Sequence, residues 1–548
     1  MTFDNKCGMY FPETETAPDE FPTKAVQESL DKETIEIWKN FFATFSYKSA
    51  INLAKKDKQP LKVYWNNIAD FKTDLGLDLA SRLDKDPERT LWLGRCAAKE
   101  FAGDKKDKIS LQIVNRSADS SPDKLTALQA HKLVTFEGLV TSTSNARPKI
   151  INAVYQCARC LAIVKEPLSN MESRRIPAPL ECYRDQGGCG KQHTSTRFNL
   201  IREKCDYIDT QFAEIVNRKT RKGISCSLPT LLIDSIEVGQ TVKVTGINTL
   251  AVPERADGIP RWYVSVNSIE NILEDIQKPS NEKMPDIKSA IAPGITGIDA
   301  VKEAIILQLF GGVPREDFDH YARGDIHILL FGKPGAGKST LLKSAMNLAP
   351  VGTYAPAPTY GIEGLIGEVV DNGGWYSVKG GEITLNTGGL LCIDDVDAIK
   401  DKVSAFFEPL EHQTVTLRAR GYSRRLPAKC SVLAAGIEKQ VSEPFRQRFD
   451  CIFKIDSASR VKGGYKRPSP ETLEEIRNYI SYARTINPVL RKDERDYLNT
   501  IDYNWRELNK VQRLAEASAR KRLSNVVEGA DIEYAHKIIE SAVSSEGK

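Results

Sequence analysis

The stretch ILLFGKPGAGKSTLLKSAMNLA, residues 328–349, decides the fold of the central part of this chain. The apolar run 328–331 predicts a buried strand, and the apolar periodicity after residue 340 predicts a helix. Between them lies a complete G-x-x-x-x-G-K-S motif, which predicts a loop whose backbone amides surround phosphate oxygens. We expect Lys338 to contact the β- and γ-phosphates of ATP and the Ser339 hydroxyl to bind Mg²⁺. The predicted nucleotide-binding residues are Gly332, Pro334, Gly335, Ala336, Gly337, Lys338, Ser339 and Thr340.

A second apolar strand, residues 390–393, ends in two acids, Asp394 and Asp395. An acid at the end of such a strand can hold Mg²⁺, and its neighbour can polarise the attacking water. We therefore predict Asp394 as a Mg²⁺ residue and Asp395 as the water-activating base. Arg448, in EPFRQRFD at 443–450, fits two interpretations. It is either a guanidinium that neutralises transition-state charge or a surface ion pair, and residue type alone favours the ion pair.

Composition limits the class of protein. The 548 residues are 41% hydrophobic and 27% charged, which excludes a fibrous or mainly disordered chain. The net charge of +4 does not by itself indicate a nucleic-acid partner. No run approaches the ~20 apolar residues of a membrane helix, and the acidic N-terminus lacks a signal-peptide pattern. The 11 cysteines are therefore expected to be mostly reduced thiols of an intracellular protein.

The pattern of apolar residues changes along the chain and predicts several domains. Helical periodicity comes first, then short β-branched runs such as LVTFEGLV and TVKVTGI, then alternating strands and helices. The polar stretch NRSADSSPDK, 115–124, predicts a linker. The expected parts are a flexible tail (1–28), a helical subdomain (29–120), a β-domain (121–273) with an insert (154–198), a linker (274–290), an α/β core (291–460) and a helical region (461–548).

Four cysteines of the insert are spaced as a metal site. Cys157-x-x-Cys160 and Cys182-x₆-Cys189 can supply four thiolates for a tetrahedral Zn²⁺, with no position left open for catalysis. The second spacing is looser than usual, so His193 is an alternative fourth ligand. Ordinary reduced cysteines remain the other interpretation, and Cys205 and Cys226 are nearby examples.

A basic segment, HQTVTLRARGYSRRLPAK at 412–429, contains five cations and no acid. Its alternating residues around a glycine-containing turn predict a β-hairpin. Cations at the tip suit sequence-independent, salt-sensitive phosphate contact, although a solvated basic turn is the simpler interpretation. The run 218–222, RKTRK, is open to the same two interpretations.

Several motifs together resemble one family. ITGIDAVKEAIILQLFGGVPRE, RGDIHILLFGKPGAGKST, GGLLCIDDVD, CSVLAAG, FRQRFD and WREL occur in the order seen in the minichromosome maintenance (MCM) replicative helicases of the AAA+ class. The resemblance implies an OB-fold β-barrel with a zinc-binding insert and an AAA+ P-loop ATPase with a helical lid. It also implies a ring, usually a hexamer, that hydrolyses ATP between subunits and unwinds DNA. Arg448 would be the arginine finger, and Arg506 would be the second sensor arginine.

The resemblance also suggests which residues contact single- and double-stranded DNA, independently of sequence. The family's channel hairpin matches 412–429, where Ala419 takes the place of a lysine, so Arg418 or Arg420 would replace it. A second hairpin, LAVPERADGIPRWYVSV at 250–266, matches the N-terminal channel hairpin. The predicted DNA-contacting residues are Arg418, Arg420, Arg255, Arg261, Arg147 and Lys149.

Four departures from the family bear on activity. Asp395 replaces a glutamate, and Ile437 replaces the sensor asparagine. The segment TYAPAPTYGIEGLIG at 353–367 differs from the Ser/Gly-rich version expected, and a C-terminal winged helix is not expected. The main hypothesis is a ring-forming, ATP-dependent DNA helicase. The alternative is an ATP-binding, weakly hydrolysing structural subunit of a homomeric or mixed MCM ring. A remodeller of protein substrates is a third, which the β-domain and basic hairpin argue against. The expected location is the cytoplasm or nucleoid of an archaeon, with the nucleus left open and no membrane partner.

Overall fold

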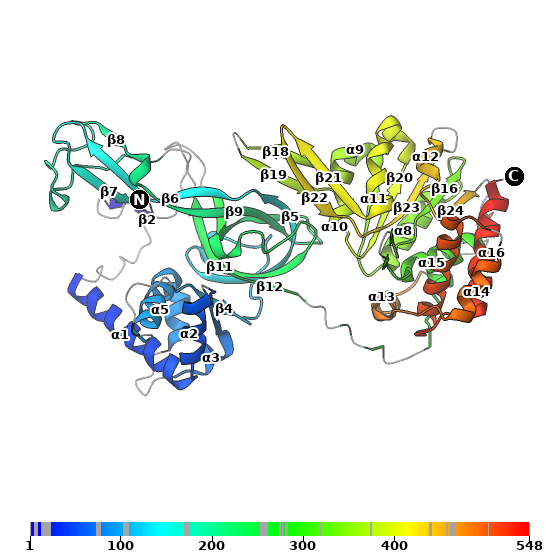
Figure 1. Cartoon of the computed structure of the whole chain (residues 1–548), viewed down its shortest axis with the longest axis horizontal. Helices are drawn as coiled ribbons and strands as arrows, with labels where there is room; N and C mark the ends of the chain where they lie inside the picture. The colour runs from blue at the N-terminus through cyan, green and yellow to red at the C-terminus, as the bar shows by residue number, and fades with distance from the viewer. Residues whose placement is uncertain are drawn as a thin grey trace. The chain divides into compact units, whose positions relative to one another are not determined.

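The structure is a computed structural model with two compact units (Figure 1). The first comprises residues 1–136, 150–207 and 243–270, and the second comprises 137–149, 208–242 and 271–548. The described residues are 2–4, 9–11, 24–57, 59–72, 78–101, 103, 109–168, 176, 178–251, 261–272, 276, 278–279, 283–317, 320–372, 375–437, 441–455, 459–460, 467–501 and 503–546.

The N-terminal region of the first unit is mainly helical, as its periodicity predicts. Its core is aromatic: Trp38, Phe41 and Phe42 are fully buried, and the Trp38 indole donates to the Thr90 carbonyl at 3.0 Å. The parallel pair of strands that joins these helices is not evident from the sequence. The elements are β1 (Thr2–Asp4), β2 (Met9–Phe11), α1 (Lys24–Thr44), α2 (Lys48–Asp57), β3 (Leu61–Tyr64), α3 (Trp65–Asp70), α4 (Leu79–Lys85), α5 (Pro87–Phe101) and β4 (Leu111–Val114).

The predicted tail and the predicted linker have different outcomes. Most of residues 1–28 lie outside the described residues, apart from the β1–β2 pair and the start of α1. Residues 115–124, predicted as a linker, lie within the first compact unit, although only Arg116 and Pro122 of the ten are buried. Arg116 donates to the Thr135 hydroxyl at 3.0 Å and pairs with Asp119 at 2.6 Å. Arg116 thus anchors a segment whose other residues lie mostly at the surface.

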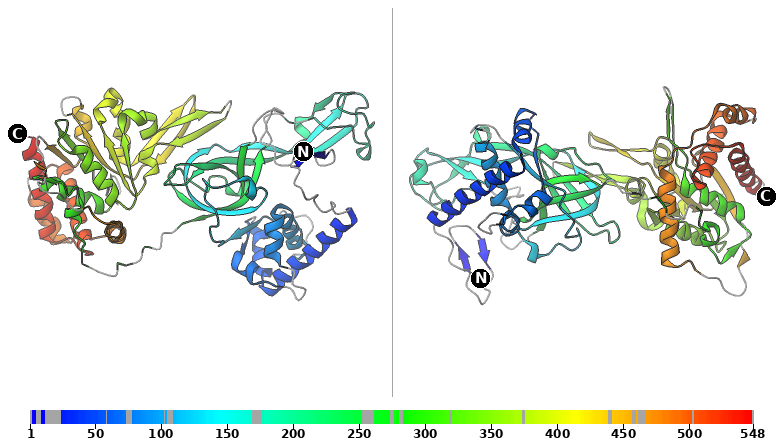
Figure 2. Two further views of the ribbon diagram at one scale, coloured as in Figure 1. Left: turned by 180° about the vertical axis from the view of Figure 1, so that it is seen from behind. Right: turned by 90° about the horizontal axis from the view of Figure 1, so that it is seen from below.

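The β-domain strands curve into a barrel (Figure 2) and belong to one sheet. They are β5 (Leu133–Ser144), β6 (Arg147–Cys157), β9 (Asp206–Val216), β10 (Gly223–Pro229), β11 (Thr241–Ala251) and β12 (Arg261–Asn271). The insert adds β7 (Ile163–Pro167) and β8 (Phe198–Leu200), which both pair antiparallel with β6. The β-branched runs of the sequence therefore form the strands that they predict.

The second unit contains a five-stranded parallel sheet in the order β17-β20-β23-β16-β24. The strands are β16 (Ile328–Gly332), β17 (Gly352–Pro356), β20 (Leu390–Asp394), β23 (Ser431–Gly436) and β24 (Cys451–Ile455). Helices α7 (Asp299–Phe310) and α8 (Lys338–Leu348) pack on it, and four more follow: α13 (Pro470–Thr485), α14 (Lys492–Thr500), α15 (Trp505–Lys521) and α16 (Gly529–Glu546).

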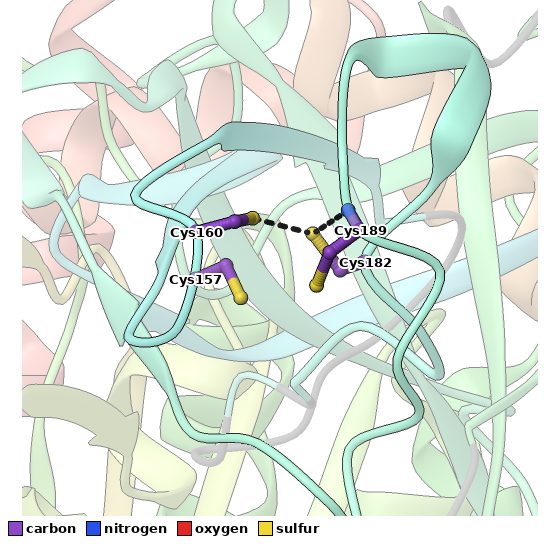
Figure 3. Close-up of side chains that lie close together, drawn as sticks. All are labelled: Cys157, Cys160, Cys182 and Cys189. Carbon is purple, nitrogen blue, oxygen red and sulfur yellow. Dashed lines mark hydrogen bonds between the residues drawn. The ribbon is translucent and has the colours of Figure 1, made fainter.

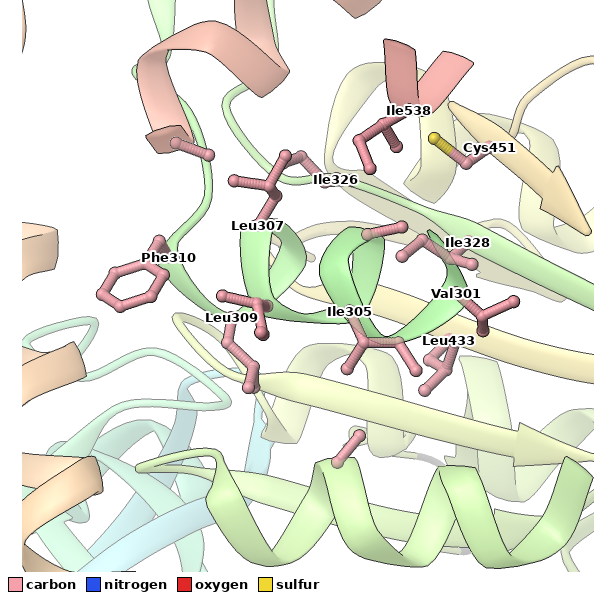
Figure 4. Packing of buried hydrophobic residues seen from close by; sticks show 14 of the residues in the cluster. Val301, Ile305, Leu307, Leu309, Phe310, Ile326, Ile328, Leu433, Cys451 and Ile538 are labelled. Carbon is pink, nitrogen blue, oxygen red and sulfur yellow. The ribbon is translucent and has the colours of Figure 1, made fainter. Parts of the chain in front are cut away.

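Helix α7 is apolar on nearly every side, which is typical of a fully buried helix. Figure 4 shows Ile305 and Leu307 leaving different sides of this helix, the first toward Leu433 of β23 and the second toward Ile326. The core thus joins the parallel sheet, α7 and the C-terminal helices. Across the described residues, no helix is long and apolar enough to cross a bilayer.

Two antiparallel hairpins extend from the parallel sheet. The first joins β18 (Gly367–Asp371) to β19 (Tyr376–Gly380), after helix α9 (Ala357–Ile366), and β19 also pairs with β5 at Ser377 and Ser144. The second joins β21 (Thr414–Ala419) to β22 (Tyr422–Pro427), after helix α11 (Phe407–His412). The second confirms the hairpin predicted from the basic segment.

A buried carboxylate ties these parts together. Asp450 is 4% exposed, accepts from Arg323 at 2.8 Å and from the His327 backbone amide at 2.7 Å, and also pairs with Arg513 of α15. Burial alone would raise the pKa of Asp450, but the charges of Arg323 and Arg513 outweigh it and hold that pKa well below its usual range. The carboxylate therefore remains charged in the folded protein.

We predict that Asp450→Ala lowers stability by about 3–5 kcal/mol, because it leaves two buried guanidiniums without their partner. The change in thermal unfolding midpoint of the full chain measures this loss. Because the folded pKa is depressed, the contribution of Asp450 is present above its unfolded pKa and is lost as pH falls toward the folded value. The control is Asp496→Ala on the exposed face of α14, expected to cost less than about 0.5 kcal/mol. Equal losses in the two variants would contradict the prediction.

Candidate nucleotide site and metal cluster

The predicted phosphate loop lies between β16 and α8, so the expected strand–loop–helix arrangement is present. Gly337 precedes the first helical residue with φ +90°, a conformation that favours glycine. A Cβ on Gly332 would lie 2.0 Å from the Ile455 carbonyl oxygen, so only glycine fits beside β24. The free amides and dipole of an α-helix N-terminus attract anions, which suits phosphate binding at the start of α8.

The Lys338 amine is held at the loop itself. It donates to the Gly332 carbonyl at 2.7 Å and to the Lys333 carbonyl at 3.0 Å. The ammonium thus lies at the mouth of the loop, where phosphate oxygens can replace the carbonyls as acceptors. This donor set, with the hydroxyl of exposed Ser339, fits a nucleotide phosphate chain.

Asp394 ends β20 at the same edge of the sheet, since the carboxyl ends of parallel strands lie together. It is 4% exposed, and both of its carboxylate oxygens have a donor. Oδ1 accepts from the Asp395 amide at 3.2 Å, and Oδ2 accepts from the Tyr354 hydroxyl at 2.6 Å. Asp394 is therefore held by a tyrosine that sequence reasoning did not select.

Asp395 is exposed beside the buried Asp394 and has φ +53°, a left-handed conformation. Partial desolvation, followed by the charges of Asp394 and Asp397, raises the pKa of Asp395, while Lys338 lowers it. A carboxylate with a raised pKa is a better proton acceptor. Its position and its basicity both fit the predicted role of water-activating base.

The end of β23 lacks the polar sensor side chain of the family. Ile437 follows the strand and is 41% exposed, and its backbone amide donates to Asp397 Oδ1 at 3.0 Å. The polar group at this point is thus the Asp397 carboxylate. An apolar side chain at 437 cannot hydrogen-bond a phosphate or a water.

Arg448 and Arg506, which are far apart in sequence, meet at one acid. Glu411 of α11 pairs with Arg448 at 3.4 Å and with Arg506 at 2.8 Å. The Arg448 guanidinium also lies 3.8 Å from the ring centroid of Phe407. Glu411 carried no sequence signal, because a lone acid in an amphipathic helix has many ordinary uses.

The site residues therefore form two separate groups within the described chain. Lys338, Ser339 and Asp394 gather at the strand ends, whereas Arg448 and Arg506 gather at Glu411. No contact recorded among the described residues joins an arginine of the second group to Lys338 or Asp394. Each group supplies part of what phosphoryl transfer requires.

The four predicted cysteines come together in the insert (Figure 3). Their sulfurs all lie within 4.8 Å of one another, and those of Cys160 and Cys182 are 3.5 Å apart. The Thr196 hydroxyl helps to lower the pKa of Cys157 to about 6, whereas burial raises that of Cys182 to about 12. This donor set fits a tetrahedral Zn²⁺ site. His193 is not part of the cluster and faces the Leu180 carbonyl at 3.3 Å.

The basic hairpin carries its cations in different environments. Arg418 and Arg420 are both exposed, and Arg420 pairs with Asp371 of β18 at 3.0 Å. Tyr422 stacks on Tyr376 of β19 with ring centroids 5.6 Å apart, so the two hairpins support each other. Phosphate contact by Arg418 or Arg420 stays a prediction.

The other predicted DNA-contacting residues are more dispersed. Arg147 lies over the neighbouring rings of Phe212 and Trp375, at 4.4 and 4.6 Å from their centroids. Lys149 is half-buried and Arg261 is exposed at the start of β12, while Arg255 lies outside the described residues. Their role in DNA binding stays a prediction.

The basic run 218–222 is at least partly bound to protein groups. Arg221 pairs with Glu382 at 2.7 Å, and Arg218 donates to the Thr241 hydroxyl at 3.0 Å. Because Arg218 and Arg221 have protein partners, the interpretation of a fully solvated basic run does not hold for these two residues.

Comparison with known proteins gives matches to two family domains. Residues 123–252 match the MCM OB domain and residues 269–459 match the MCM P-loop domain. The chain belongs to the minichromosome maintenance (MCM) family.

Relatives of this MCM protein come from archaea and eukaryotes. It is 28% identical to the minichromosome maintenance protein MCM of Saccharolobus solfataricus, over 80% of this chain and 74% of that protein. It is 27% identical to the DNA replication licensing factor mcm4 of Schizosaccharomyces pombe and 28% identical to the probable DNA helicase MCM8 of Oryza sativa. These matches cover 75% and 62% of this chain, and 56% and 49% of the two eukaryotic proteins, so the chain spans about half their length.

We predict that Glu411→Ala changes stability by less than about 1 kcal/mol, because its ion pairs are partly exposed to water. Thermal unfolding of the full chain measures the change. The matched control is Glu408→Ala on the same helix. Glu408 accepts from the Thr416 amide at 3.1 Å and from two threonine hydroxyls, so its loss should cost more, about 1–2 kcal/mol. A loss at Glu411 as large as that at Glu408 would show that Glu411 is a structural anchor.

Proposed function

We propose that this MCM protein is an ATP-dependent DNA translocase of the replicative helicase type, acting as a ring. The separation of the two groups of site residues carries the proposal. One subunit offers Lys338, Ser339 and Asp394 at one place and the arginines at Glu411 at another. A complete site then forms where the arginines of one subunit reach the nucleotide of the next. Repetition of this head-to-tail contact closes a ring, which we expect to be a hexamer of this chain or a mixed ring with a related subunit.

Each residue has a defined role in the proposed reaction. Lys338 binds the β- and γ-phosphates, while Ser339 and Asp394 hold Mg²⁺. The ion would neutralise phosphate charge when bound. Asp395 orients and deprotonates the attacking water. Arg448 from the neighbouring subunit stabilises the charge on the γ-phosphate, and Arg506 supports it.

The basic hairpin links this reaction to DNA. Arg418 at the exposed tip of β21 contacts phosphates, and Arg420, Arg147, Lys149, Arg255 and Arg261 are the other proposed contacts. Phosphate contact alone gives sequence-independent, salt-sensitive binding. Residues 461–548, which hold Arg506, act as the lid of the ATPase core at 291–460. The similarity to replication licensing factors supports a role in DNA replication.

A second candidate function rests on Ile437 and Asp395. Ile437 offers no side-chain hydrogen bond at the strand end, and Asp395 is one methylene shorter than the family's glutamate. A subunit with these residues could bind ATP and DNA but hydrolyse slowly. It would then contribute Arg448 to a more active neighbour in a mixed ring.

We predict that the purified chain hydrolyses ATP, that single-stranded DNA stimulates it, and that Lys338→Ala and Arg448→Ala each abolish it. Steady-state phosphate release measures the rate. Mixing the two inactive variants should restore part of the activity. An interface with Lys338 from one variant and Arg448 from the other is intact, because the two residues come from different subunits.

These measurements distinguish the self-sufficient motor from the structural subunit. No recovery on mixing, with each variant folded and assembled, would contradict a shared active site. Tight ATP binding without turnover, with or without DNA, would replace the self-sufficient motor by the structural subunit. Arg491→Ala, on an exposed surface before α14, is the control for loss of a cation.

We also propose that Cys157, Cys160, Cys182 and Cys189 bind one structural Zn²⁺ that stiffens the insert. The sulfur positions support this proposal. A four-thiolate site has no open position, so the metal would have no part in hydrolysis.

We predict one zinc per chain in the purified protein, measured by elemental mass spectrometry. Cys182→Ala should lose the metal, because three remaining thiolates leave the tetrahedral site incomplete. Cys205 is a buried cysteine outside the cluster, and its thiol donates to the Ile201 carbonyl. The Cys205→Ala variant should therefore retain the zinc. Equal zinc content in the two variants would contradict the assignment.

A further inference from the structure

Tyr354 contacts one of the residues proposed to hold Mg²⁺. Its hydroxyl donates to Asp394 Oδ2 at 2.6 Å. Tyr354 lies in β17 and Asp394 ends β20, so this hydrogen bond joins two neighbouring strands. No other described side chain is recorded as bonding to the Asp394 carboxylate.

The backbone and ring of Tyr354 are both held. It lies in β17, which pairs with β20 in parallel, with Pro356 opposite Asp394. The Lys343 ammonium of α8 lies 4.8 Å from the Tyr354 ring centroid. Strand pairing and the cation over the ring both restrain the Tyr354 side chain. Its hydroxyl is therefore held in one position.

The hydroxyl completes the orientation of the Asp394 carboxylate. Oδ1 is already fixed by the Asp395 amide at 3.2 Å, and the tyrosine fixes Oδ2. Each carboxylate oxygen has a second lone pair, so these bonds leave acceptor positions for a metal or its water. Hydrogen-bond partners outside the ligand shell commonly set how a carboxylate meets a metal.

We propose that Tyr354 is a positioning residue for Mg²⁺, acting through Asp394. This inference rests on the proposed function, because it requires a magnesium–nucleotide complex at the phosphate loop. Tyr354 orients the Asp394 carboxylate before the ion arrives, so less ordering is left for the binding step.

The test uses the full chain and a fluorescent ATP analogue. Its binding is followed by anisotropy during a Mg²⁺ titration, for the wild type, Tyr354→Phe and Tyr479→Phe. Phenylalanine keeps the ring and removes only the hydroxyl. Tyr479 is the matched control: it is 2% exposed, and its hydroxyl donates to the Lys521 carbonyl at 2.9 Å in the C-terminal helices. Thermal unfolding of each protein without nucleotide or metal reports any structural loss.

We expect Tyr354→Phe to raise the half-saturating Mg²⁺ concentration about 10-fold or more, the usual effect of losing such a partner. Binding of the analogue in excess chelator should change less than about twofold, since a residue acting through the metal has no effect when the metal is absent. Saturating Mg²⁺ should restore most of the ATP turnover. Tyr479→Phe should leave the Mg²⁺ dependence unchanged, even if its unfolding midpoint falls.

Two results would overturn the inference alone. One is a Tyr354→Phe protein whose Mg²⁺ dependence equals that of the wild type, and the other is tighter Mg²⁺ binding, which would make the hydroxyl a competitor of the ion. Failure of the wild type to bind the analogue with Mg²⁺ would instead overturn the proposed nucleotide site, and this inference with it.

Discussion

The ion cluster around Asp450 is the constraint on which the second unit depends. The carboxylate lies just before β24 and binds Arg323, Arg513 and the amide of His327, so it joins the entry to β16, the edge of the sheet and helix α15. Separating these elements would leave a charge buried and unpaired, which costs several kcal/mol. Arg323 also donates to the Arg448 carbonyl at 3.1 Å. The proposed finger therefore extends from a fixed backbone, two residues from the buried charge.

The fixed backbone at Arg448 bears on why the site residues form two separate groups. The Arg448 guanidinium pairs with a partly exposed acid, Glu411, whereas the arginines around Asp450 are buried. A partly exposed ion pair contributes little to stability and is easily exchanged for another anion. A phosphate on a neighbouring subunit carries more negative charge than one carboxylate and accepts a forked guanidinium equally well. The proposed finger, Arg448, thus pairs with an acid that water reaches, whereas Arg323 and Arg513 pair with a fully buried one.

Sequence reasoning succeeded where the signal is local. The glycines and flanking runs of 328–349 specify strand, loop and helix within about 20 residues, and alternation around one turn specifies the hairpin at 412–429. It failed where the signal depends on distant neighbours. Tyr354 meets Asp394 from a separate strand, and Glu411 meets Arg506 from a helix 95 residues away. The anchoring of the segment 115–124 was not evident either, because Arg116 and Asp119 look like ordinary polar residues of a linker.

The departures at the strand ends can be weighed by magnitude. Partial desolvation, followed by the charges of Asp394 and Asp397, raises the pKa of Asp395, and each unit of pKa is worth at most about tenfold in proton acceptance. The shorter side chain works in the opposite direction, since a misplacement near 1 Å costs about 10²-fold. The loss from the shorter Asp395 side chain is then larger than the gain from its raised pKa. The Ile437 side chain has no polar group that could hold the attacking water in place. Lys338 and Asp394 nevertheless lie at the loop and strand end where we propose phosphate and Mg²⁺ binding, so we propose a slow ATPase rather than an inactive one.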